Sequence, residues 1–192
     1  TPYRQVINRF FTRDRIERLE PAVRRIAAEL LDPYVTAGGG DLCTEFTHRY
    51  PGYVFAEFFR LPPDLGMRIR EITAVYNLAL QEVRDEAVAS TSRELYAIAT
   101  EIIAMRKKNP LPPEQDLVNA LLAKRWKGEP LPDDLILGTI RQMIVVGMIA
   151  PGVHIGTVAA HLSRHRDLQD QLRAEPGLIP AAVEEYLRLY TP

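Results

Sequence analysis

Glu185 and Arg188 are the clearest pair of side chains that could act together, because they stand three residues apart in AAVEEYLRLYTP. Residues at this spacing share one face of a helix, so the carboxylate and the guanidinium can form a bidentate ion pair. An exposed pair contributes under about 1 kcal/mol to stability. Taken alone, the spacing favours a surface ion pair.

Histidine and cysteine are the other residue types that could bind a metal or transfer a proton. His161 and His165 have the i,i+4 spacing of a zinc pair, but no third ligand accompanies them. His154 could donate a proton, although a histidine in an apolar helix is more often a core residue with its hydrogen bonds satisfied. The single cysteine, Cys43, excludes a disulfide framework and a multi-thiolate metal site, and we interpret it as a small packing residue.

The overall composition is that of a globular chain with no strong field. Lys and Arg number 24 against 25 Asp and Glu, and 46% of the 192 residues are hydrophobic. We therefore expect one or two domains, and neither nucleic acid nor a membrane surface as a partner. The opening TPYRQVINRF has no initiator Met and no apolar signal core, so we expect a piece of a longer, cytoplasmic protein.

A long uncharged segment lies near the middle of the C-terminal half. No Lys, Arg, Asp or Glu occurs from Gln142 to Ser163, a length that would just span a bilayer. Pro151, three glycines and two histidines make a poor spanning helix, so we interpret the segment as a buried helix of a soluble protein. Pro151 has no N–H to offer the carbonyl of Gly147, which predicts a kink and an exposed backbone acceptor.

The remaining pattern predicts one helix after another, with one extended segment at 41–46 that follows Gly38-Gly39-Gly40. Thr12 is placed to cap a helix over RDRIERLE, and Pro21 to begin a second helix, AVRRIAAELLDPYV, with a buried face. NPLPPEQD is expected to be a loop. Further helices are expected at 50–59, 64–80, 90–108, 118–124, 132–165, 166–176 and 178–191.

This order of elements closely resembles the cytochrome P-450 family, in particular its soluble bacterial members. Glu185-x-x-Arg188 resembles the family's K-helix signature, a structural pair that supports the haem-binding core. The long helix resembles the I helix, which crosses the haem. YRQVINRFFT resembles the C helix, and Arg4 matches an arginine that contacts a haem propionate. The chain thus looks like an internal fragment from the C helix to the K helix.

The resemblance implies a mainly α fold with a long central kinked helix and little β structure. It implies that residues 1–192 form part of a single catalytic domain that uses haem b to oxidise a small apolar organic substrate by monooxygenation. Electrons would come from a ferredoxin and its reductase or from a fused reductase. The family's axial cysteine lies in a Phe-x-x-Gly-x-x-x-Cys-x-Gly loop, which this chain lacks. We therefore expect the fragment itself to bind no stable thiolate-ligated haem.

The sequence departs from the family where protons are relayed during oxygen activation. The family's acid and alcohol fall on Ile149 and Ala150, neither of which can transfer a proton. A water or a substrate hydroxyl could substitute, peroxide could replace dioxygen, or the chemistry could be reductive or a rearrangement. The carbonyl freed by Pro151 could hold such a water, or the kink could merely shape the pocket. Gly147 and Met148 are the residues expected to line the haem groove.

A rival interpretation is a helical ligand-binding or interaction module without redox chemistry, in which the long helix is only a core strut. The segments that resemble the substrate-contacting F and G helices, PDLGMRIREITAVYNLAL and SRELYAIATEIIAMRKK, carry no diagnostic charge. The substrate class therefore stays open. A Phe-x-x-Gly-x-x-x-Cys-x-Gly loop encoded downstream of Pro192 would distinguish the haem enzyme from the module.

Overall fold

The computed structural model describes residues 2–190, and side chains from residue 4 onward. Its architecture is mainly helical with a single short hairpin, which confirms the predicted fold class. The helices are α1 (Pro2–Asn8), α2 (Arg13–Thr36), α3 (Tyr50–Phe59), α4 (Pro63–Gln81), α5 (Asp85–Lys108), α6 (Leu117–Ala123), α7 (Asp133–Arg164), α8 (Arg166–Ala174) and α9 (Ile179–Leu189). A π-helical turn (Cys43–Thr47) and a 3₁₀ turn (Pro176–Leu178) complete the helical structure.

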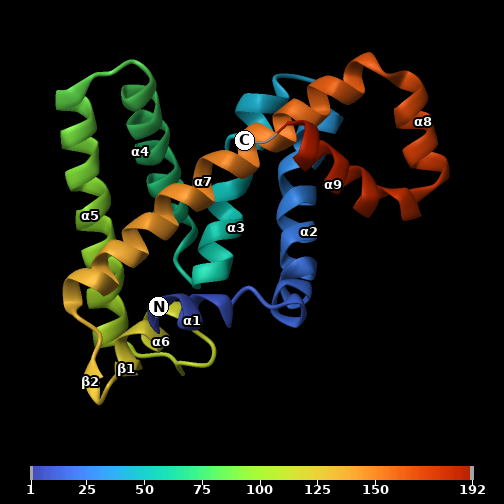
Figure 1. Cartoon of the computed structure of the whole chain (residues 1–192). Helices are drawn as coiled ribbons and strands as arrows, with labels where there is room; N and C mark the ends of the chain where they lie inside the picture. The colour runs from blue at the N-terminus through green and yellow to red at the C-terminus, as the bar shows by residue number, and fades with distance from the viewer. Residues whose placement is uncertain (1, 191–192) are drawn as a thin grey trace.

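The long helix α7 organises the molecule. Figure 1 shows it running diagonally from the lower end of α5 to α8 and α9 on the other side, lying across α3. Every fourth residue on its inner side is buried, because this spacing returns to nearly the same face of a helix. The inner stripe consists of Ile136, Ile140, Ile144, Met148 and Gly152.

The core forms where this stripe meets α3, α4, α5 and α6. It is made of aliphatic and aromatic side chains that are almost wholly excluded from water, among them Phe55, Phe59, Ile69, Leu95, Ile98, Ile102, Val118 and Leu121. Burial of such side chains stabilises a fold by roughly 1.5–3 kcal/mol each. The core thus holds α7 by one side only.

Two predicted helices are in fact the single helix α2, which runs through Pro21. Pro21 lacks the N–H that would bond the carbonyl of Glu17, but both residues are exposed, so water can satisfy that carbonyl. Thr12 occupies the N-cap position, yet its side chain makes no capping hydrogen bond. Of the predicted buried face only Ile26 is fully buried.

The segment 41–46 is not extended, as predicted, but leads into the π-helical turn. The carboxylate of Asp41 accepts hydrogen bonds from the backbone N–H of Cys43 at 2.9 Å and from the hydroxyl of Thr44 at 2.6 Å. It therefore caps the helical turn, and these bonds, the Thr44 side chain first, lower the pKa of Asp41. Gly38 and Gly39 take positive φ values of 80° and 127°, which confirms the predicted turn before it.

The other elements follow the predicted pattern closely. Helix α5 begins at Asp85, five residues before the predicted start, with Asp85 and Glu86 in a first turn that favours negative charge. The sequence analysis did not predict the antiparallel pair of β1 (Arg125–Trp126) and β2 (Glu129–Pro130). Lys127 and Gly128 turn the chain between these strands with φ values of 54° and 90°.

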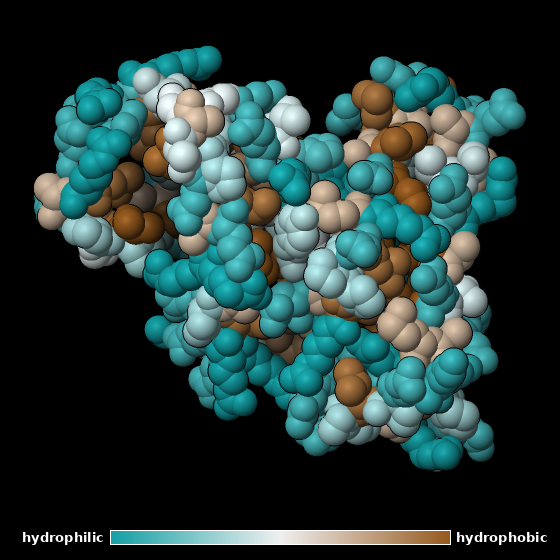
Figure 2. Space-filling model, turned by 180° about the vertical axis from the view of Figure 1, so that it is seen from behind, coloured by the Kyte–Doolittle hydropathy of each residue, from teal (hydrophilic) through white to brown (hydrophobic). Residues whose placement is uncertain are grey.

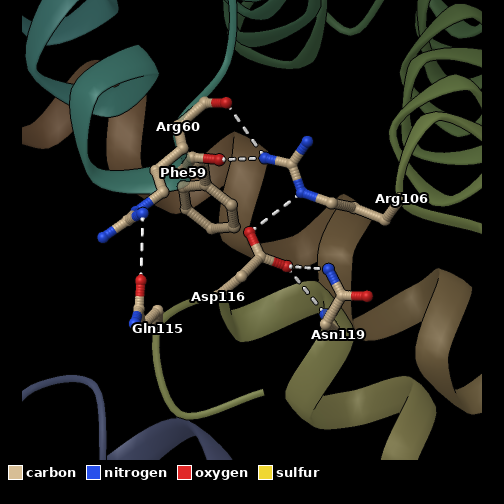
Figure 3. Close-up of polar contacts among 6 residues, drawn as sticks. All are labelled: Phe59, Arg60, Arg106, Gln115, Asp116 and Asn119. Atoms are coloured by element: carbon tan, nitrogen blue, oxygen red, sulfur yellow. Dashed lines mark hydrogen bonds and ion pairs between the residues drawn. The ribbon is translucent and has the colours of Figure 1, made fainter. Parts of the chain in front are cut away.

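A buried polar network ties three helices together (Figure 3). Arg106, near the end of α5, donates from Nε to Oδ2 of Asp116 at 2.9 Å and from Nη2 to the carbonyls of Phe59 and Arg60 at 2.7 and 3.0 Å. The other carboxylate oxygen of Asp116 accepts from the backbone and side-chain N–H groups of Asn119, so Asp116 caps the start of α6. The end of α3, the end of α5 and the start of α6 are thereby fixed to one another.

By length and composition alone, α7 would be long and apolar enough to cross a membrane. In the fold its inner side packs in the core. Close packing is visible at Gly152, where a Cβ atom would lie 2.6 Å from the carbonyl oxygen of Thr47. This glycine lets the π-helical turn approach the backbone of α7.

Candidate functional site

The side of α7 that faces away from the core is an open apolar stripe. Val146 and Val153 are 59% and 53% exposed, and the half-buried Ala150 lies between them on the same side of the helix. In Figure 1 no other element lies in front of the middle of α7 on the viewer's side. Contiguous exposed apolar surface of this kind marks a contact site for another group.

The predicted haem-groove residues divide between the two sides of α7. Met148 is fully buried in the core, and Gly147 faces the ring of Phe55, where a Cβ atom would meet Cδ2 at 3.0 Å. Ile149 is half-buried and packs against the core, so Ala150 is the member of this run that lies on the open side. The position of Met148 counts against direct contact with a group on the open stripe.

Pro151 lies inside α7, which continues as a helix from Asp133 to Arg164. Its missing N–H deprives the carbonyl of Gly147 of the usual donor four residues on. Pro151 itself is exposed, so water can reach this part of the helix. The role of the Gly147 carbonyl as a water site stays a prediction.

The hydroxyl groups on α7 do not replace the missing acid and alcohol. Thr139 donates its hydroxyl proton to the carbonyl of Leu135 at 2.7 Å, and Thr157 donates to that of Val153 at 2.9 Å. Both hydroxyl protons are therefore engaged in hydrogen bonds within α7. Along the open stripe around Ala150, the chain offers apolar surface and backbone but no side-chain acid.

Arg4 and Cys43 lie away from this stripe. Arg4 is exposed on α1 and makes no ion pair with a described residue, and α1 packs against α6. Its contact with a haem propionate stays a prediction. Cys43 is exposed, and its Sγ lies 3.7 Å from where a Cβ of Gly156 would be, on a different face of α7 from Ala150.

Glu185 and Arg188 form the bidentate pair that their spacing predicts. Nε and Nη2 of Arg188 donate to the two carboxylate oxygens at 2.8 and 2.6 Å, and both side chains are more than half exposed. These bonds lower the pKa of the Glu185 carboxyl and raise that of the guanidinium. The pair is confirmed, and its supporting role for a haem core stays a prediction.

A cluster of aromatic and imidazole rings joins α9 to α7, and the sequence analysis did not foresee it. His161 Nδ1 lies 2.7 Å from the hydroxyl of Tyr190, and the His161 ring stacks on that of His165 with centroids 4.3 Å apart. Tyr186 meets His161 edge-on and is nearly buried, and its burial raises the pKa of its phenol. No group of three metal-ligating side chains occurs among residues 4–190.

Beside this cluster an apolar groove of about 320 Å³ runs between the end of α7 and the helices α8 and α9. Figure 2 shows hydrophobic surface gathered around a hollow at this end of the molecule. The groove is lined mainly by leucines and alanines, with His161, Glu185 and Tyr186 as its titratable members. Nothing among the described residues shows what occupies it.

Two arginines near α4 were also missed by the sequence analysis. Arg141 of α7 lies over the rings of Tyr76 and Tyr96, 5.0 and 5.5 Å from their centroids, and so connects α4 and α5 to α7. Arg70 is only 6% exposed, and its Nη2 lies 2.9 Å from Nδ1 of His48. A guanidinium can only donate, so His48 accepts through a neutral Nδ1.

No family model matches the chain. Mycinamicin IV hydroxylase/epoxidase of Micromonospora griseorubida is 30% identical over 96% of the chain, and cytochrome P450 CYP107DY1 of Priestia megaterium is 28% identical over the whole of the chain. A solved structure of the mixed-function P450 MycG with mycinamicin V is 30% identical and superimposes with a TM-score of 0.81 over 97% of the chain. The chain spans 46% of these two curated relatives and 47% of that structure.

Proposed function

Because the chain is related to the bacterial cytochromes P450 over nearly its whole length, we propose that it forms the central helical part of a haem-dependent monooxygenase. Two curated relatives are named as a hydroxylase/epoxidase and a hydroxylase, and this relationship carries the proposal. The proposed cofactor is haem b, with electrons supplied by a ferredoxin and its reductase or a fused reductase in the cytoplasm. The chain itself is the part from the C helix to the K helix of one catalytic domain.

The open stripe of α7 fits the flat, apolar face of a haem. Val146, Ala150 and Val153 are the residues that would contact it, since they are apolar, exposed or half-exposed, and share one side of the helix. Met148 would instead act from the core by supporting the helix behind them. Bound there, haem would supply the redox chemistry of oxygen activation.

The axial thiolate of the proposed enzyme must come from outside the described residues. Cys43 is the single cysteine of the chain, and it lies against Gly156 on another face of α7. It is therefore in no position to bind a metal held over Ala150. We propose that a cysteine loop of the complete gene product supplies this ligand and that the chain alone is inactive.

Proton delivery in the proposed enzyme is atypical. Ile149 and Ala150 cannot transfer protons, and the neighbouring threonine hydroxyls donate to their own helix. A water held by the carbonyl of Gly147, or a hydroxyl of the substrate, is the remaining route for dioxygen. Peroxide as oxidant would remove the need for that route, and reductive chemistry is the third option.

The substrate is proposed only as a small apolar organic molecule. The relatives' names include mycinamicin IV, cyclomarin C and 6-deoxyerythronolide B, which differ from one another, so they favour no single compound for this chain. The apolar character of the α7 stripe supports an apolar substrate beside it.

The carbon-monoxide difference spectrum of the reduced complete gene product tests this function. We expect the Soret band that is characteristic of thiolate-ligated haem. Haem uptake without that band would refute thiolate ligation. No haem uptake, together with no Phe-x-x-Gly-x-x-x-Cys-x-Gly loop in the reading frame, would favour the helical interaction module instead.

A further inference from the structure

Three of the chain's four histidines follow one side of α7, with His154 and His161 in the helix and His165 directly after its end. His154, His161 and His165 are seven and four residues apart, which is about two turns and one turn, so their side chains point in nearly the same direction. The facing element is α9, whose Tyr186 and Tyr190 are themselves one turn apart. The spacing on both helices thus produces a contact made of rings.

Tyr190 lies lengthwise along this row and is held at both ends. Its carbonyl oxygen is 3.4 Å from Nδ1 of His154, and its hydroxyl is 2.7 Å from Nδ1 of His161. A carbonyl only accepts, so His154 carries its proton on Nδ1. Tyr186 stacks with Tyr190 at 6.3 Å between centroids, which fixes the phenol ring from the other side.

We propose that Tyr190 and His161 form a redox-active pair in which the phenol is oxidised by one electron and the imidazole takes its proton. The O–H bond of Tyr190 breaks, its proton moves to Nδ1 of His161, and one electron leaves for a strong one-electron oxidant. The products are a neutral tyrosyl radical, an imidazolium and the oxidant reduced by one electron. Return of one electron and of the proton restores the pair.

The contact between the two side chains carries this proposal. A base must lie about 2.6–3.2 Å from the heavy atom whose proton it accepts. At 2.7 Å from the Tyr190 oxygen, His161 Nδ1 meets this condition in the tautomer with its proton on Nε2. Without such a base, oxidation would produce a high-energy protonated phenol radical cation. The stack of His161 on His165 holds the imidazole in this orientation.

The other described tyrosines lack such a partner. The hydroxyl of Tyr34 donates to a carbonyl, that of Gly40, and the hydroxyl of Tyr53 accepts from Arg49. Neither partner is a base that can take up the phenolic proton. Tyr190 is the one tyrosine among residues 4–190 whose hydroxyl bonds an imidazole, and at 36% exposure it can be reached by a soluble reductant.

The location of the pair suggests a role in the complete protein, and this role rests on the proposed function. Ala150 and His161 are eleven residues apart on one helix, roughly 17 Å along its axis at 1.5 Å per residue. Oxidising equivalents left unused at the open stripe could therefore be discharged through Tyr190. The redox activity of the pair itself does not depend on haem.

The test is photochemical oxidation of the purified chain by flash-generated ruthenium(III) tris-bipyridine, with the tyrosyl radical detected by electron paramagnetic resonance. We expect a signal that is lost in Tyr190→Phe and kept in Tyr186→Phe, the matched control on the same helix. His161→Gln keeps a hydrogen-bond acceptor but removes the base, so it should lower the radical yield. Radical formation should be slower in D₂O for the unmodified chain and for Tyr186→Phe, and this isotope effect should be reduced in His161→Gln.

Either of two results would overturn the proposal. One is an unchanged signal in Tyr190→Phe, and the other is an unchanged yield and isotope effect in His161→Gln. Far-ultraviolet circular dichroism of each variant confirms that the helices are retained. Because no haem is present, failure here is separate from failure of the carbon-monoxide spectrum.

Discussion

Nε of Arg106 donates a 2.9 Å hydrogen bond to Oδ2 of Asp116 inside the protein, where the side chains are 5% and 1% exposed. Removal of one partner leaves the other charge buried and unpaired, so Asp116→Ala should lower the free energy of unfolding by about 3–5 kcal/mol. Urea denaturation gives this value directly.

The double variant Arg106→Met with Asp116→Ala should lose less free energy of unfolding than the sum of the losses in the two single variants, because no unpaired buried charge then remains. The exposed pair Arg13 and Glu17 provides the comparison, since Arg13→Met should change stability by at most about 1 kcal/mol. Simple additivity in the double variant would show that the pair is not coupled.

Gly152 and Gly138 of α7 should respond in opposite ways to alanine. At Gly152 the new Cβ would lie 2.6 Å from the Thr47 carbonyl oxygen, so overpacking should destabilise the protein by about 1–3 kcal/mol. At Gly138 nothing lies within 4 Å of the new Cβ, and alanine forms helices better than glycine, so this substitution should stabilise the protein by up to about 1 kcal/mol. Equal thermal shifts for the two variants would contradict the close crossing.

Substitution by glycine should have opposite effects on stability at Val83 and at Val75. Val83 has a φ of 54° in the connection between α4 and α5, a conformation that costs a β-branched residue about 1–2 kcal/mol. Val83→Gly should therefore stabilise the chain by about 1 kcal/mol, whereas Val75→Gly within α4 should destabilise it by about 1 kcal/mol. Urea midpoints compare them, and a loss of stability in Val83→Gly would exclude the predicted relief of strain.

His48 should make stability depend on pH in the acidic range. Burial, and then the charge of Arg70, lower its pKa below the ordinary 6.5. The unfolded chain then binds the proton more readily, so the free energy of unfolding is at its full value above about pH 6.5 and falls as the pH drops toward the folded-state pKa.

His48→Gln can still accept from Arg70 but does not titrate. Urea unfolding from about pH 8 to about pH 5 should therefore show a smaller acid loss in this variant than in the unmodified chain. Parallel curves for the two proteins would mean that His48 is not the group responsible.

Ala150 offers a test of the proposed proton route in the complete gene product. Ala150→Thr restores an alcohol where a general acid relay would act, so a larger fraction of NADH consumption should appear as oxidised product. Peroxide-driven turnover should change little. Efficient NADH coupling that is the same before and after the substitution would show that the missing alcohol does not matter.

The sequence pattern predicted the long elements best, because each carries many periodic residues. The helical pattern at 132–165 placed α7 within one residue at each end, and Glu185 and Arg188 pair as their spacing requires. Local signals gave a wrong prediction where water could replace a lost hydrogen bond. At Pro21 the helix continues, because the carbonyl of Glu17 that lacks its usual donor is exposed to water. The prediction of an extended segment at 41–46 was wrong because the capping carboxylate of Asp41 stabilises a helical turn there.

The arrangement of the sites on α7 could not be predicted from the sequence and became clear only in the structure. Periodicity predicts which residues share a face but not which face the core covers, so it did not reveal that Met148, a residue expected to line the haem groove, is buried in the core. The signal for the ring cluster was readable in the spacing of His154, His161 and His165 and of the two tyrosines on the next long helix. It was missed because the histidines were weighed as metal ligands or proton donors and not as partners of the tyrosines.

The uncovered valines of α7 also determine how the purified chain should behave in solution. Val146 and Val153 present apolar surface to water along the middle of the helix, and such surface favours association between molecules. Solutions of the chain should therefore bind hydrophobic dyes and form oligomers in proportion to concentration. Val153→Lys would make the chain easier to handle, since a charge in the stripe opposes that self-association.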